Sequence, residues 1–131
     1  MSTMEQTEQG LSIKETAERT GLSQDTLRFY EKEGLIFPVH RLPNGHRRFS
    51  RSDLDWLGFI KCLRSTGMPH SEIISYKQLL EQGERAFDRR RSILLRHRDK
   101  IRKELEDLQS ALGAIEWKIE HHYSIEKGLQ E

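Results

Sequence analysis

The hydrophobic positions in the first part of the chain fall into short helical groups that are separated by glycine. A first helix is predicted from Ser12 to Thr20. A second helix begins after the N-cap residue Ser23 and ends at Gly34, which can adopt the left-handed conformation of a helix stop. Two short helices joined by a glycine turn predict a helix-turn-helix.

The next part of the chain predicts a basic β-hairpin. Pro43-Asn44-Gly45 lies between two short segments, as a hairpin turn would. From His40 to Arg51 the chain carries four arginines and no carboxylate, so the hairpin is strongly basic although the net charge of the chain is only +1. Two further helices are expected, one opening near Ser52 and the other running from Pro69 to about Glu81.

The hydrophobic pattern changes after about Glu84. Apolar residues now alternate at spacings of three and four without an intervening proline, which predicts a coiled coil. At about 1.5 Å per residue such a helix would be ~60 Å long, too long to be stable without a partner, so a homodimer is expected. The predicted dimer seam consists of Leu94, Ile101, Leu105, Leu108, Leu112, Ile115, Ile119 and His122.

Charge along this helix favours an antiparallel pair. Residues 89–103 are mostly basic, whereas the helix is acidic from Glu104 onward. An antiparallel arrangement sets the basic half of one copy against the acidic half of the other, whereas a parallel one would stack like charges. The fold class is therefore mainly α: a winged helix-turn-helix with a small hairpin wing, then a long helix that forms an antiparallel coiled-coil dimer. The expected divisions are a disordered extension (1–10), the domain of the helix-turn-helix and its hairpin (11–82), the dimerisation helix (83–123) and a C-terminal tail (124–131).

Composition excludes several classes of protein. The chain is 34% hydrophobic and 33% charged, and no apolar run approaches the roughly 20 residues needed to span a bilayer. A polar, acidic N-terminus is unlike a signal peptide, so the expected location is the cytoplasm, without a membrane partner. The single cysteine, Cys62, excludes an intrachain disulfide, a thiolate zinc cage and a four-cysteine iron–sulfur site. No cofactor or metal is expected, because the adjacent His121 and His122 point about 100° apart and have no evident third ligand.

The second helix has a buried side and a side that is free for contacts. Leu27, Tyr30 and Glu31 fall at i, i+3 and i+4, which leaves Gln24 and Arg28 on the more exposed side. Such a basic position is often only an ordinary solvated helix face. The basic hairpin beside it favours nucleic-acid binding instead.

The exposed residues of this helix offer chemistry suited to the major groove of DNA. Arg28 can reach a phosphate or a guanine edge with its fork of donors, Phe29 offers a flat ring, and Thr26 a short hydroxyl. Phe49 and Leu54, in contrast, alternate with charged neighbours and are expected in the core.

Three stretches of the chain resemble the MerR family of bacterial transcription regulators. They are the helix-turn-helix SIKETAERTGLSQDTLRFYEKEGLI, the wing NGHRRFS and the helix DLDWLGFIKCLRSTGM, and the likeness extends from Leu11 to about Ile73. The resemblance implies a winged helix-turn-helix, an antiparallel coiled-coil dimer, and activation by RNA polymerase of promoters whose two polymerase elements are spaced too far apart. It places Arg28, Phe29 and Tyr30 at the DNA and gives Arg47 a phosphate contact. The candidate DNA-binding residues are Ser23, Gln24, Thr26, Arg28, Phe29, Tyr30, His46, Arg47 and Arg48.

Two interpretations of Cys62 are open from the residues alone. It is either a small buried core residue or a reactive sensor thiol. Lys61 and Arg64 are one and two positions away, so they do not share its helix face and give little support for a lowered thiol pKa. The segment IKCLRSTGM resembles the single-cysteine, thiol- and aldehyde-responsive branch of the family, the NmlR/AdhR type, which favours the sensor.

The predicted function is that of a homodimeric regulator and not of an enzyme, because no base and orienting group can be assigned around Cys62. The regulator is expected to bind a palindromic promoter and to activate it by distorting the DNA, in response to modification of Cys62 by an electrophile, aldehyde or oxidant. Two alternatives remain: a regulator gated by a non-covalent small ligand with Cys62 structural, or an architectural DNA-bending protein.

Overall fold

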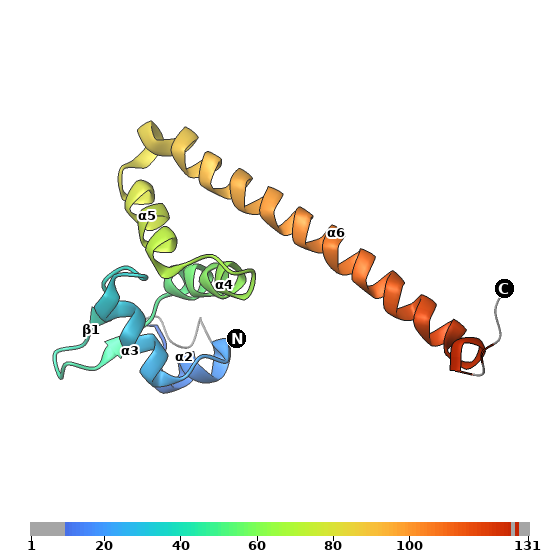
Figure 1. The fold of residues 1–131 in the computed structure, drawn as a ribbon. Coiled ribbons are helices and arrows are strands. Elements are labelled where there is room, and N and C mark those ends of the chain that lie inside the picture. The colour runs from blue at the N-terminus through green and yellow to red at the C-terminus, as the bar shows by residue number, and fades with distance from the viewer. Residues whose placement is uncertain (1–9, 127, 129–131) are drawn as a thin grey trace. The chain divides into compact units, whose positions relative to one another are not determined.

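The computed structural model describes residues 10–126 and residue 128, so the predicted N-terminal extension, apart from Gly10, and half of the predicted C-terminal tail lie outside the described residues. The chain divides into two compact units, Met1–Arg90 and Arg91–Glu131. The described elements, in chain order, are α2 (Ile13–Thr20), α3 (Gln24–Glu33), β1 (His40–Arg41), β2 (Arg47–Arg48), α4 (Arg51–Ser65), α5 (His70–Glu81), the 3-10 helix η1 (Gly83–Ala86) and α6 (Phe87–Glu126) (Figure 1). None of the described helices is long and apolar enough to cross a membrane.

Side-chain caps determine where the first two helices begin. The Ser12 hydroxyl accepts the Glu15 N–H at 3.1 Å while the Glu15 carboxylate accepts the Ser12 N–H at 2.9 Å, so α2 opens with a capping box. Ser23 caps α3 by accepting the Thr26 N–H at 3.0 Å. Gly21 and Gly34 end the two helices with φ values of 78° and 84°, which side chains with a Cβ rarely adopt. These caps confirm the helix-turn-helix that the sequence predicted.

The hairpin wing consists of two very short antiparallel strands. His40 pairs with Arg48 and Arg41 with Arg47, around a turn closed by Leu42 and His46. The base of the wing is tied to the start of the chain, because Phe49 and Leu11 exchange backbone hydrogen bonds of 2.8 Å in both directions. A Cβ on Gly10 would lie 2.5 Å from the Phe49 carbonyl oxygen, so only glycine fits beside this bridge.

The first unit has one apolar core beneath the helix-turn-helix and the wing. Phe49 is fully buried there, as predicted, whereas Leu54 is half-buried. Helix α4 begins at Arg51, close to the predicted opening near Ser52, and its N-cap is Ser50, which forms a capping box with Asp53. The fully buried side chains include Leu11, Leu27, Leu35, Phe49, Leu57, Ile60, Met68 and Ile73.

The second unit is the long part of α6, a helix of 40 residues in total. It begins at Phe87 and not near Glu84, because the preceding residues form the 3-10 turn η1. Of the predicted seam, Leu94 and Ile101 are half-buried and His122 is exposed. The remaining seam side chains are 52–69% exposed in the single chain: Leu105, Leu108, Leu112, Ile115 and Ile119.

Candidate nucleic-acid interface

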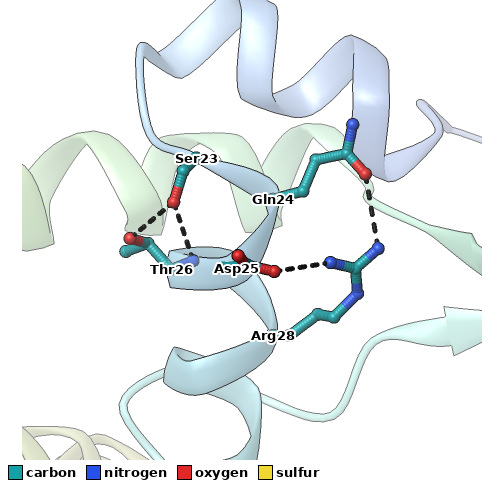
Figure 2. Close-up of polar contacts among 5 residues, drawn as sticks. All are labelled: Ser23, Gln24, Asp25, Thr26 and Arg28. Carbon is teal, nitrogen blue, oxygen red and sulfur yellow. Dashed lines mark hydrogen bonds and ion pairs between the residues drawn. The ribbon is translucent and has the colours of Figure 1, made fainter.

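Helix α3 presents an ordered arginine on its outer face. One terminal nitrogen of Arg28 lies 3.0 Å from Asp25 Oδ1 and the other 3.3 Å from Gln24 Oε1, so both neighbours hold the guanidinium (Figure 2). The Arg28 side chain is 46% exposed, and such surface pairs contribute only ~0.2–1 kcal/mol. A phosphate or a guanine edge can therefore replace these partners at little cost.

The two hydroxyls at the start of α3 are already engaged with each other. Besides accepting the Thr26 N–H, Ser23 donates to Thr26 Oγ1 at 2.8 Å (Figure 2). Both were predicted DNA contacts, and the predicted capping role of Ser23 is confirmed. Their lone pairs and the exposed position of Ser23 leave them able to meet DNA as well.

The aromatic residues of the predicted Arg-Phe-Tyr triplet lie in different environments. Phe29 is 44% exposed, whereas Tyr30 is only 7% exposed because it lies on the inner face with Leu27. His70, in the first turn of α5, contacts both rings, with centroids 5.9 Å from Phe29 and 6.1 Å from Tyr30. His70 was not among the predicted residues, although its place just after Pro69 at a helix start was a usable signal, since helix N-termini attract anions.

The wing arginines are paired with carboxylates from the two helices of the helix-turn-helix. Arg47 Nε lies 2.7 Å from Glu31 Oε1, and Arg41 approaches the same oxygen at 3.5 Å. Arg48 lies 3.8 Å from Glu15 Oε1. The arginine cluster has no carboxylate within its own segment, but tertiary folding supplies two. Glu31 was predicted on the inner side of α3, but its arginine partners were not predicted.

These contacts shift both carboxylates toward the ionised form. For Glu31, burial is the largest effect and raises the pKa, but hydrogen bonds from Arg47 and the Val39 N–H and the charges of Arg47 and Arg41 together lower the pKa below its ordinary value. For Glu15, hydrogen bonds from the backbone and the hydroxyl of Ser12 lower the pKa most. Both groups are therefore anions at neutral pH.

A cationic cleft of about 280 Å³ lies between the start of α2, α3 and the wing. In the part of the chain that the structure describes, Arg48 Nε is a buried nitrogen without a hydrogen-bond partner. Clustered guanidinium groups beside the start of a helix suit a phosphate group. The cleft is lined by Ser12, Ile13, Arg28, Gly45, His46, Arg47 and Arg48.

Cys62 is exposed on α4. The alternative that it is a buried core residue is wrong for the single chain, because the inward face of α4 is formed by Leu57, Ile60 and Leu63. Its carbonyl oxygen accepts the hydroxyls of Ser65 and Thr66, each at 2.9 Å. The thiol is open to reagents from solution. Among the described residues, no three His, Cys, Asp or Glu side chains are grouped so that they could hold a metal ion.

Comparison with known families decides the family of this chain. Residues 11–80 match the MerR HTH family of regulatory proteins, and residues 54–117 match the MerR DNA-binding family. The chain belongs to the MerR family. It is thus a DNA-binding transcriptional regulator of mainly helical structure with a MerR-type helix-turn-helix, a two-stranded hairpin and a long C-terminal helix.

Individual relatives support the predicted branch of the MerR family. The chain is 37% identical over 91 residues to the HTH-type transcriptional regulator AdhR of Bacillus subtilis, a match that covers 70% of this chain but only 65% of AdhR. The regulator YyaN of B. subtilis is 31% identical over 128 residues, covering 88% of this chain and 93% of YyaN. The crystal structure of HiNmlR, a MerR family regulator that lacks the sensor domain, was determined bound to promoter DNA. It is 31% identical, with a TM-score of 0.80 and coverage of 88% of this chain and 92% of HiNmlR. These relatives are regulators and not enzymes, as predicted here.

Proposed function

We propose that this MerR-family protein is a homodimer that binds a palindromic promoter, with α3 of each copy in the major groove and each wing on the flanking phosphates. The observation that carries this proposal is the cationic cleft, because it joins Arg28 of α3 to Arg47 and Arg48 of the wing in one continuous surface. HiNmlR, with a similar fold, binds promoter DNA. Base contacts from α3 would select the sequence, and the wing would fix the register.

Matched arginine substitutions test this interface. The probe is a DNA duplex selected by the wild-type protein from a random-sequence pool. Arg28→Ala should weaken binding to it by about 1–3 kcal/mol if the guanidinium reads a base edge. Arg47→Ala should weaken binding to all sequences and reduce the dependence of affinity on salt.

Arg85→Ala provides the control for these substitutions. Arg85 is exposed on η1, which follows the C-terminal end of α5, whereas His70 at the other end of α5 contacts Phe29. Unchanged affinity and salt dependence in both test variants, or equal losses in the control, would argue against the proposed surface.

Dimerisation is proposed through α6. Five apolar side chains of the seam are more than half exposed, and a continuous exposed apolar stripe on a helix of this length requires a partner. The basic segment 89–103 and the acidic residues after it favour antiparallel pairing with a second copy.

Activation is proposed to occur by deformation of DNA, so that RNA polymerase can engage a promoter whose elements are spaced too far apart. A dimer that binds both half-sites can use part of its binding free energy to bend or untwist the DNA between them. This deformation is easiest at flexible pyrimidine–purine steps. Run-off transcription with polymerase on the chain's own upstream promoter tests this. Binding without increased transcription under any inducer would support an architectural protein instead.

Cys62 is proposed as the sensor. The exposed position of Cys62 on α4 supports this role, as does the resemblance of the segment IKCLRSTGM to the single-cysteine branch of the family. Modification would shift the population toward an activating conformer by as much as the modified thiol interacts differently with the two states. Intact-mass measurement after formaldehyde or hydrogen peroxide treatment should show an adduct or oxidation in the wild type that Cys62→Ser lacks.

The transcriptional response decides between a covalent sensor and a ligand-gated regulator. Cys62→Ser should bind promoter DNA normally but lose the induced transcription. An unchanged response would instead support gating by a non-covalent small ligand.

A further inference from the structure

Glu31 is the point at which the wing is attached to α3 by polar contacts. Its Oε1 accepts Arg47 Nε at 2.7 Å and lies 3.5 Å from a terminal nitrogen of Arg41, while its Oε2 accepts the Val39 N–H at 3.0 Å. One carboxylate therefore holds the residue before β1, one residue of β1 and one of β2. The Glu31 side chain is 17% exposed.

The hairpin needs such an anchor because its own strands are short. Each strand has two residues, and a two-stranded hairpin by itself is at best marginally stable in water. The apolar anchors Val39 and Phe49 lie outside the strands, at the base of the wing. Arg41 also donates to the Gly45 carbonyl oxygen at 2.9 Å, so it connects Glu31 to the tip of the wing.

The contact with Glu31 leaves most of Arg47 available for DNA. Only Nε of Arg47 bonds to the carboxylate, and its two terminal nitrogens have no hydrogen bond within the described residues. Because a guanidinium has five donors in a planar fork, one edge can remain on Glu31 while another binds a phosphate. The carboxylate thus fixes the direction of the arginine without using up its donors.

We propose that Glu31 is a positioning residue that holds the wing in its DNA-binding orientation. This role rests on the proposed DNA interface. It means that a carboxylate in that interface is required for specific binding even though its charge repels phosphate. A purely electrostatic effect has the opposite sign, since removing a negative charge near DNA should strengthen binding.

Glu33 provides a matched control. It is an exposed carboxylate two residues further along α3, and its side chain has no ion pair or hydrogen bond within the described residues. Glu31→Gln and Glu33→Gln remove the same charge from the same helix, but only the first disrupts the wing contacts. A glutamine at position 31 has one acceptor oxygen in place of two, because its amide nitrogen is only a donor and cannot accept from a guanidinium or from the Val39 N–H.

The experiment measures affinities of the full-length protein for a duplex selected by the wild type and for a random-sequence duplex. Glu33→Gln should bind both slightly more tightly. Glu31→Gln should lose about tenfold in specific affinity relative to Glu33→Gln, the equivalent of one charge-assisted hydrogen bond, with a smaller loss on the random duplex. Equal behaviour of the two variants would overturn the role of Glu31. Absence of specific binding by the wild type would instead overturn the proposed function.

A second pair of variants separates positioning from loss of folding. If Glu31→Gln is unfolded at the assay temperature, Glu31→Asp is compared with Glu33→Asp, since both keep the charge and shorten the side chain by one methylene. Only Glu31→Asp should lose specificity. NMR offers a readout without DNA: exchange of the Arg47 Nε–H with solvent should be slow in the wild type and accelerate in Glu31→Gln. Fast exchange in the wild type would contradict the hydrogen bond between Arg47 Nε–H and Glu31.

Discussion

The most direct quantitative prediction concerns the apolar seam of α6. Leu108 and Leu112 are 67% and 55% exposed in the single chain. Complete burial of a leucine side chain stabilises by about 1.5–3 kcal/mol, so covering half to two thirds of it in a dimer contributes about 1–2 kcal/mol. The double substitution Leu108→Ala and Leu112→Ala removes these contributions from both copies. The expected loss is about 4–8 kcal/mol, which raises the dimer dissociation constant by roughly three to six powers of ten.

Sedimentation equilibrium over a range of concentrations measures this loss directly. The wild type should be dimeric at micromolar concentration, and the double variant monomeric. The change in the dissociation constant cannot come from lower helix propensity, because alanine favours the helix at least as well as leucine does. A parallel measurement of circular dichroism should show how much of α6 depends on its partner.

Trp117→Ala provides the matched control. Trp117 is 54% exposed and apolar, but at 100° per residue it lies roughly 160° around α6 from the centre of the seam. Its ring stacks on His121 of the same helix, with centroids 4.2 Å apart. Removing it should leave the dimer intact. A double seam variant that stays dimeric, or a Trp117→Ala variant that dissociates equally, would refute the argument that the leucine stripe forms the interface.

Three further predictions concern the first unit. Phe49→Ala should lower the free energy of unfolding by about 3–5 kcal/mol in urea denaturation, because the side chain is fully buried; a loss below 1 kcal/mol would contradict its place in the core. Gly10→Ala should cost roughly 1–3 kcal/mol by the same measurement, since its φ is +96° and the new Cβ would meet the Phe49 carbonyl oxygen. The pKa values of Glu15 and Glu31 are lowered on folding, so their stabilisation is complete above the unfolded value of about 4.5 and is lost as pH falls through the folded values. The stability difference between wild type and Glu31→Gln should accordingly be constant near neutral pH and shrink in acid; a difference that grows in acid would reverse the assigned sign.

Local signals were sufficient to predict the helix-turn-helix. Ser12 and Ser23 supply caps through hydroxyls that reach N–H groups within the same turn, and Gly21 and Gly34 end the helices by their own backbone freedom. These interactions involve residues close together in the chain, so they are visible in the sequence. The start of α4 was predicted to within two residues. Ser50 and Ser52 are equally good caps in isolation, and only the course of the chain after Phe49 selects Ser50.

Contacts between segments that are far apart in the chain could not be predicted from the sequence. Nothing near Arg47 indicates that Glu31, 16 residues earlier, accepts its Nε–H, and nothing near Phe29 indicates His70. The same limit applies to Cys62, whose apolar neighbours permitted a buried position until the packing of α4 assigned the inward face to others.

By itself, then, the sequence determined the order of the elements, the basic character of the wing and the apolar stripe of α6, because short-range hydrogen bonds and periodicity encode them. Only the tertiary structure decided how the cationic surface is organised. The attraction between two charges depends on their distance in space, which folding determines, and not on their separation along the chain. The arginines of the wing have no carboxylate near them in the sequence, but in the folded protein they pair with Glu15 and Glu31.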